Sequence, residues 1–242
     1  MIVNEDNDCF EIIFQRAHGM LAAKIAEKIN PSMRPPQAYW LEILVAIADH
    51  DDGRRGWEGD FHIDEKGFPK NFTEFEFDHK QAERVINTAA CKSRWVGLMI
   101  SMHLVELYAD LDNQEAQKLV QDQKEHQLRL LKQLAVSKEQ AKSYYYLLKW
   151  SDELSLRICQ KQFPEKGQRD YLERLPNGKD SFLKNSIGLS IDPWVFEEES
   201  AIFEIETRKI AKRPYKDDLD LQTELNKAEV KISSFEFKRG DV

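Results

Sequence analysis

The chain has 242 residues, of which 41% are hydrophobic and 32% charged, and its formal net charge is −8. This composition predicts a soluble globular protein whose core is large enough to fold without disulfide bonds. The acidic charge and the lack of a long basic run argue against a nucleic-acid polymer as partner, although a local pocket could bind a small nucleotide. With three distant cysteines, no signal pattern and no apolar run of about 18 residues, we expect a cytoplasmic protein that does not enter a membrane.

Helices are predicted over most of the first 164 residues. A short β-rich segment at 9–14 comes first and predicts an edge strand. Apolar residues at helical spacing then predict helices over residues 17–30, 37–51, 79–91, 93–110, 114–134 and 137–162. The helix at 93–110 is apolar on nearly all sides and should be central, whereas the charged helix at 114–134 should lie outside. The long loop at 53–78 is of a length that is usually functional.

The pattern changes after Pro164. Residues 165–188 are polar and predict a loop with a turn at Pro176-Asn177-Gly178. Alternating apolar residues at 202–206, 230–232 and 235–237 predict three to five strands, with a short helix near 220–228. We therefore expect a mainly α fold with an all-alpha core: a bundle of about six helices in residues 1–164, and a small β-rich extension, 165–242, packed on it. The extension could cover an edge of the core or form a homodimer contact.

An acidic run ends the apolar helix at 37–51. Asp49, Asp51 and Asp52 surround His50 just before Gly53, a typical helix stop signal. Carboxylates at the negative end of a helix dipole cost about 0.3–1 kcal/mol each. Because a bound cation would turn that cost into a gain, the sequence predicts a metal ion beside His50 and Asp51.

Two further residues complete the candidate metal site. Asp152 lies between Leu148 and Leu156 on a largely apolar helix, so it should face the interior, where it needs a cation, a charged partner or several hydrogen bonds. The structural alternative is an ion pair with Lys149 or with a histidine. His18 lies at the start of the first helix, where it could bind the metal or simply cap and pack.

The order of His18, the doublet His50-Asp51 and Asp152 resembles that of the HD domain. The resemblance implies an HD-like helical core in which these four residues bind a divalent metal ion. Imidazole and carboxylate ligands suit Mn, Fe, Ni, Zn or Mg, and the pattern does not choose among them. Such a metal supports phosphoester hydrolysis by activating water and neutralising phosphate charge. Asp51 would also be a catalytic residue that orients the attacking water.

Five segments resemble a bacterial family catalogued as domain of unknown function 3891. They read QRAHGMLA at 15–22, AIADHDDG at 46–53, GFPKNF at 67–72, WSDELSL at 150–156 and IDPWVF at 191–196. The resemblance covers nearly the whole chain and brings no assigned activity. One departure is that Arg54-Arg55 stands where the family pattern has an aromatic residue directly after the glycine, and Trp57 follows a little later.

Other residues are candidates for contact with a substrate. Arg54 and Arg55 follow the doublet directly and could hold a phosphate, or could be exposed loop charges. Lys149 is a third candidate for phosphate binding. His103, on the central helix, is a second catalytic candidate, although a lone histidine there is often a core residue.

The aromatic residues Phe72, Phe75 and Phe77 could line a base-stacking pocket but more simply cover the core. The leading functional prediction is a metal-dependent phosphohydrolase that acts on a small phosphorylated, nucleotide-like molecule. One alternative is a non-catalytic binding or regulatory module on an HD-like scaffold. Another is an HD-like iron oxygenase, for which His79 and His103 are the only plausible ligands of a second iron.

Overall fold

The structure, a computed structural model, describes residues 1–52 and 62–240. It contains the six helices predicted for the first part of the chain, each within a few residues of its predicted range. They are α1 (Gln15–Glu27), α2 (Gln37–Asp49), α3 (His79–Ala90), α4 (Arg94–Tyr108), α5 (Gln114–Leu134) and α6 (Lys138–Gln160). Local capping explains several of the starts. Ser137 and Gln140 form a capping box at the start of α6, and Ser93 Oγ accepts a hydrogen bond from Val96 N at the start of α4.

Besides the helices, the fold contains a seven-stranded mixed sheet that includes strands from both ends of the chain. The prediction of a mainly α, all-alpha protein is therefore wrong. The structure is 49% helix and 22% strand. The strands are β1 (Ile2–Glu5), β2 (Cys9–Ile13), β3 (Gln168–Arg174), β4 (Asp180–Asn185), β5 (Leu189–Asp192), β6 (Ser200–Ala211) and β7 (Val230–Lys238). Their order is β1-β2-β6-β7-β5-β4-β3, and the β5–β7 pair is parallel while the other pairs are antiparallel.

Two physical reasons account for the error. The predicted loop at 165–188 contains β3 and β4, which flank the predicted turn. Leu172 is the only buried residue of β3, so the strand lacks a clear alternating pattern. The N-terminal hairpin joins the same sheet because β2 pairs with the end of β6, Cys9 facing Ala211. A pairing between such distant segments leaves no local sequence signal.

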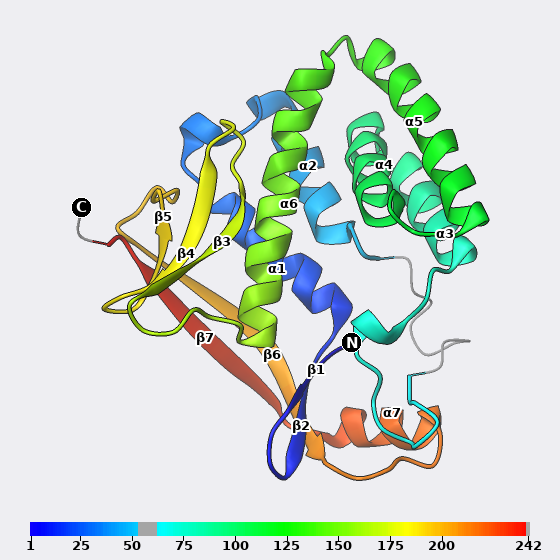
Figure 1. Ribbon diagram of the computed structural model, residues 1–242, viewed down its shortest axis with the longest axis vertical. Coiled ribbons are helices and arrows are strands. Elements are labelled where there is room, and N and C mark those ends of the chain that lie inside the picture. Colours follow the sequence, from blue (N-terminus) through cyan, green and yellow to red (C-terminus); the bar gives the residue numbers. More distant parts are fainter. Residues whose placement is uncertain (53–61, 241–242) are drawn as a thin grey trace.

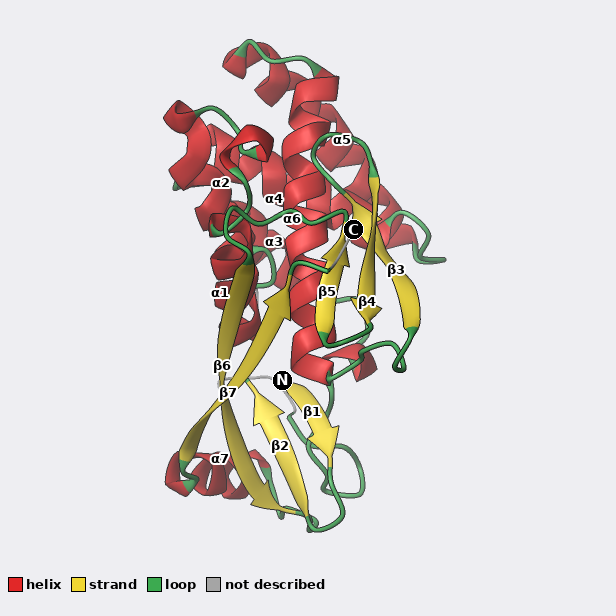
Figure 2. Cartoon of the chain, turned by 90° about the vertical axis from the view of Figure 1, so that its left-hand side faces the viewer, coloured by secondary structure: helices red, strands yellow, loops and turns green. Residues whose placement is uncertain are grey.

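The sheet lies along one side of the helices (Figures 1 and 2). α1 packs against β6, and α6 packs against β1 and β3. Trp150 Nε1 on α6 donates a 3.0 Å hydrogen bond to Ser181 Oγ on β4, and one apolar cluster runs from the helices to Phe203 and Phe237 of the sheet. The predicted boundary at residues 164 and 165 falls just after α6, and the core continues across it. The division into a helical domain, 1–164, and an extension packed on it, 165–242, stays a prediction.

A smaller cluster lies at the end of the molecule that carries β1 and β2. The helix α7 (Asp218–Lys227), predicted at 220–228, packs there through Leu221 and Leu225 against Phe10 and Ile210 (Figure 2). None of the helices in the described part of the chain is both long and apolar enough to cross a membrane.

Close approach of α1 and α2 positions the candidate site. A Cβ atom built on Gly19 would lie 2.3 Å from the carbonyl oxygen of Ala48, a distance that real side chains do not tolerate. Only glycine therefore lets the start of α1 rest on the last turn of α2. His18 and His50, which neighbour these two residues in sequence, are brought together as a result.

Candidate metal centre

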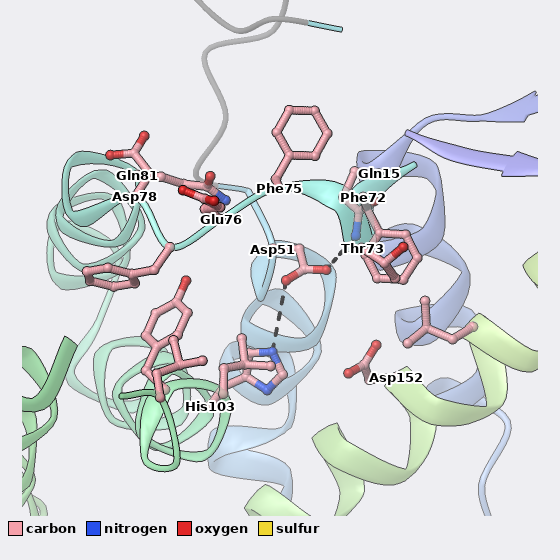
Figure 3. A pocket seen from close by; sticks show the side chains of 15 residues that line it. Gln15, Asp51, Phe72, Thr73, Phe75, Glu76, Asp78, Gln81, His103 and Asp152 are labelled. Carbon is pink, nitrogen blue, oxygen red and sulfur yellow. Dashed lines mark hydrogen bonds and ion pairs between the residues drawn. The ribbon is translucent and has the colours of Figure 1, made fainter. Parts of the chain in front are cut away.

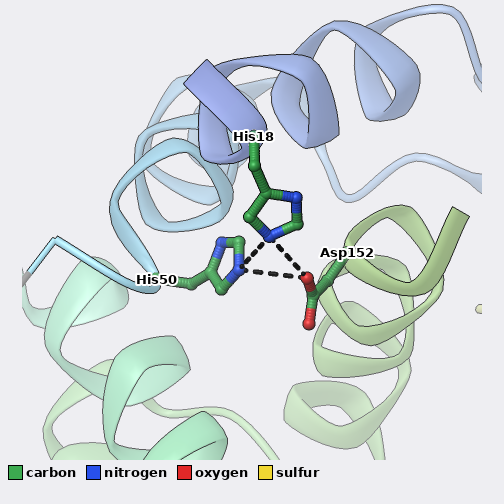
Figure 4. Close-up of side chains that lie close together, drawn as sticks. All are labelled: His18, His50 and Asp152. Atoms are coloured by element: carbon green, nitrogen blue, oxygen red, sulfur yellow. Dashed lines mark hydrogen bonds and ion pairs between the residues drawn. The ribbon is translucent and has the colours of Figure 1, made fainter. Parts of the chain in front are cut away.

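Three helices each contribute one side chain to a buried cluster. His18 comes from α1, His50 is the C-cap residue of α2, and Asp152 comes from α6 (Figure 4). His18 Nε2 lies 3.2 Å from His50 Nε2 and 3.0 Å from Asp152 Oδ1, and His50 Nε2 lies 3.1 Å from the same oxygen. The two histidines are 0% and 1% exposed, and the short distances show that these atoms face one another directly. The structure thus brings together three of the four predicted metal ligands as a nearly equilateral triangle.

Hydrogen bonds to the far side of each ring fix which nitrogen carries the proton. His50 Nδ1 lies 2.7 Å from the carbonyl oxygen of Ile47, which can only accept, so Nδ1 is the protonated nitrogen. His18 Nδ1 lies 2.8 Å from Ser155 Oγ, and that hydroxyl donates its single proton to the carbonyl oxygen of Asp152 at 2.8 Å. Ser155 Oγ therefore accepts from His18 Nδ1. In the neutral form of each ring, Nε2 has a lone pair that faces the cluster.

Three lone-pair atoms at such short range repel one another unless a positive charge lies between them. One proton can bridge only one edge of the triangle, and Asp152 Oδ1 is buried without a properly oriented hydrogen bond among the described residues. A metal ion satisfies all three atoms at once, and imidazole nitrogens bonded through their other nitrogen are the usual ligands of such ions. The cluster therefore has the donor chemistry of a metal site.

The spacing of the donor atoms fits an ion of ordinary size. Three neighbouring ligands of an octahedral ion with bonds of about 2.1 Å lie about 3 Å apart, and tetrahedral zinc with bonds of about 2.0 Å spreads them to about 3.3 Å. The separations of 3.0, 3.1 and 3.2 Å lie in this range. His18, His50 and Asp152 can therefore hold one divalent cation, and the geometry does not select among the predicted metals.

Asp51 is the fourth predicted ligand and lies next to the triangle. Its Oδ2 is 3.5 Å from His50 Nε2 and 3.8 Å from His18 Nε2, and it accepts a 2.7 Å hydrogen bond from Gln15 Nε2. The other two aspartates of the acidic run have basic partners, since Asp49 pairs with Lys92 and Asp52 pairs with Arg16. Asp51 has no lysine or arginine partner among the described residues, so the unfavourable interaction with the helix dipole falls mainly on this carboxylate.

The charges within the cluster depend strongly on one another. Burial disfavours the charged form of His50, but Asp152 and then Asp51 outweigh burial and raise the pKa of His50 to about 10. Burial likewise opposes ionisation of Asp152 and Asp51, yet the positive charge of His50 holds the pKa of Asp152 well below its usual range and also lowers that of Asp51. Without a metal ion, the two carboxylates therefore favour the protonated form of His50, whose charge lies where a cation would bind.

A cavity of about 400 Å³ opens beside the cluster (Figure 3). Asp51, Asp152 and His103 line it, so the polar centre is accessible to a small molecule. His103 Nε2 lies 4.0 Å from Asp51 Oδ1, and its Nδ1 is buried without a hydrogen-bond partner among the described residues. Burial, followed by the charge of His50, lowers the pKa of His103 to about 4, so this ring is neutral at pH 7. The structure thus places the predicted catalytic residues, Asp51 and His103, on one wall of the cavity.

The predicted phosphate-binding residues are placed differently. Lys149 does not line the cavity, because its Nζ lies 2.5 Å from Glu106 Oε1 and 3.2 Å from Glu173 Oε1. Arg54 and Arg55 lie outside the described residues.

Of the remaining candidates, the three phenylalanines line the cavity, whereas His79 lies apart from the candidate metal ligands. Phe72, Phe75 and Phe77 all line the cavity, and Phe72 also packs on the core. His79 lies 3.3 Å from Glu83 on α3. Two groups among the described residues could hold a metal, and His79 belongs to neither of them: His18, His50 and Asp152 form one, and His50, Asp51 and His103 form the other.

Fold and site together define a mixed helix-and-sheet protein whose buried His-His-Asp cluster opens on a cavity. The chain belongs to the family described as "Protein of unknown function (DUF3891)", whose family model matches residues 1–212. The match confirms the family that the five segments indicate, and its description names no activity. Comparison with curated proteins and with solved structures found no match in either set.

Two side chains that hold the candidate ligands in place were not predicted from the sequence. Ser155, which fixes the protonation of His18, follows Asp152 by three positions on α6, so helical spacing could have placed it on the same face. Gln15, which binds Asp51, precedes His18 by three positions on α1. The contribution of Tyr108 to the cavity had no sequence signal, because it depends on how α4 meets the segment after the long loop.

Proposed function

We propose that the protein is a metal-dependent phosphohydrolase of the HD type that acts on a small phosphorylated molecule. The observation that supports this most strongly is the triangle of lone-pair atoms from His18, His50 and Asp152 beside an open cavity. When bound there, a divalent cation supplies charge neutralisation for a phosphate and makes a water molecule more acidic. The cavity volume of about 400 Å³ suits a molecule of nucleotide size.

The protein's own residues divide the remaining tasks. Asp51 is ionised, lies between the ligand triangle and His103, and is held by Gln15, so it can orient a water molecule and accept its proton. His103 is neutral and can donate or accept a hydrogen bond beside Asp51. Gln15 and Ser155 keep the acidic and imidazole groups in place.

Phosphate release from a panel of phosphomonoesters, including nucleoside monophosphates, tests the proposal. The full chain is depleted of metal and reloaded in turn with Mn, Mg, Fe(II), Ni or Zn. We expect hydrolysis with at least one metal and a loss of about 100-fold or more in Asp51→Asn, as is usual when a general base is removed. The exposed variant Glu65→Gln serves as the control. A chain that binds metal but releases no phosphate from any ester would contradict hydrolysis and leave the binding-module alternative.

A further inference from the structure

The cavity beside the metal centre has an apolar wall that is open to solvent. Phe77 and Tyr108 pack edge to face with their ring centroids 4.9 Å apart. Leu107 and Leu111, which also line the cavity, are 47% and 37% exposed. Open apolar surface next to a polar centre is typical of a site that binds the organic part of a ligand.

The charge of the cavity is unusual for a site that takes a phosphate. Among its described lining residues four are acidic and none is a lysine or arginine; the acidic ones are Asp51, Glu76, Asp78 and Asp152. Asp51 and Asp152 belong to the metal centre. One divalent cation would balance that pair, which leaves the charges of Glu76 and Asp78 at the other end (Figure 3).

Glu76 is the acidic residue that is free to contact a ligand. Asp78 accepts a 2.8 Å hydrogen bond from Lys80 N as the N-cap of α3 and lies 3.7 Å from Arg84. Glu76 is exposed, lines the cavity and forms no ion pair with another described residue. A second phosphate or a carboxylate on the ligand would be repelled here, whereas a cation would be attracted both by Glu76 and by the adjacent aromatic faces.

We propose that this part of the cavity binds an organic cation, so that the substrate is a phosphoester whose apolar or aromatic body carries an ammonium or guanidinium group. Glu76 pairs with the positive group, and Phe77 and Tyr108 contact the body beside it. The position of the phosphate at the metal centre rests on the proposed function. The cationic subsite does not, because it depends only on residues at the other end of the cavity.

Three probes without phosphate test the subsite independently of hydrolysis: 2-phenylethylammonium, the neutral 2-phenylethanol and the anionic 3-phenylpropionate. Their dissociation constants are measured by NMR titration of the full, chelator-treated chain, so that the carboxylate of 3-phenylpropionate cannot coordinate a metal ion. We expect the ammonium compound to bind about tenfold more tightly than the alcohol, which corresponds to about 1.4 kcal/mol, and the anion to bind most weakly.

Matched variants separate the role of Glu76 from the effect of the protein's overall negative charge. Glu76→Gln should bind the ammonium compound and the alcohol equally, within about twofold, whereas Glu65→Gln, also exposed but outside the cavity, should keep the wild-type preference. Equal binding of ammonium and alcohol by the wild type, a preference for the anion, or an unchanged preference in Glu76→Gln would each overturn the subsite. Because no probe contains phosphate, a lack of phosphohydrolase activity leaves this result unchanged.

Discussion

Ser155 shows how a single hydroxyl can orient a histidine so that its other nitrogen is free to bind a cation. Its proton goes to the carbonyl oxygen of Asp152, so its oxygen must accept from His18 Nδ1, and His18 Nε2 is left to bind a cation. The carbonyl oxygen of Ile47 has the same effect on His50. At the residue scale, the site therefore depends on partners that touch no substrate.

Substitution of Ser155 should weaken metal binding without unfolding the chain. Loss of such an outer partner typically costs about 10–100-fold in metal affinity, and we expect this for Ser155→Ala. Ser151→Ala is the matched control. Ser151 is also fully buried on α6, but its hydroxyl donates only to backbone carbonyls of its own helix. Competition with a fluorescent chelator measures both affinities, and equal affinities in the two variants would refute the role of Ser155.

Metal binding should depend on pH because His50 retains a proton in the metal-free protein. The pKa of His50 is raised from 6.5 to about 10. The pairing of protonated His50 with Asp152 therefore stabilises the metal-free fold fully below pH 6.5, and this stabilisation is lost as the pH rises through about 10. A metal ion must displace this proton. Affinity should therefore rise about tenfold per pH unit near neutrality, with about one proton released. Calorimetry in buffers of different ionisation enthalpy measures the release, and an affinity that does not change with pH would contradict the assignment.

At the scale of elements, the site is a junction of α1, α2 and α6. The sequence predicted these helices well because each has apolar residues at helical spacing. It indicated His50, Asp51 and Asp152 as candidate ligands because an acidic helix end and a carboxylate on an apolar helix are visible in the sequence. It did not predict the contact between Gly19 and Ala48, since helix spacing says nothing of which faces meet.

Gly19→Ala tests whether that contact holds the ligands together. The added Cβ would lie 2.3 Å from the backbone oxygen of Ala48, so α1 must move away from α2. We expect a loss of about 1–3 kcal/mol in the free energy of unfolding, together with weaker metal binding. Gly97→Ala on α4 is the control, because its nearest neighbours lie 3.9 Å away and alanine favours a helix. Denaturant titration gives the stabilities, and equal effects of the two variants would contradict the positioning role of Gly19.

At the scale of the whole molecule, the largest error concerned the sheet. The strands β6 and β7 show partial alternation and were predicted in part, but β3 and β4 are polar strands that resemble a loop. The hairpin of β1 and β2 joins the sheet through residues far away in sequence. Local periodicity predicts which residues form an element, whereas long-range pairing decides how many strands share one sheet.

A metal ion that bridges three helices should stabilise the whole fold. At a metal concentration of about 100 times the dissociation constant, the gain is about 2.7 kcal/mol. For a chain of this size, that should raise the melting temperature by about 5–10 °C over the chelator-treated protein. Differential scanning calorimetry with and without metal measures the shift. If Asp152→Asn showed the same shift, the stabilisation would have to come from another site.

The most direct test is the metal content of the purified chain after supplementation with divalent metals, measured by elemental mass spectrometry. We predict about one tightly held ion per chain in the wild type and in the exposed control Asp112→Asn, and less than about a tenth of that in His50→Ala and Asp152→Asn. A wild-type chain that holds no more metal than these two variants would contradict a metal site at His18, His50 and Asp152.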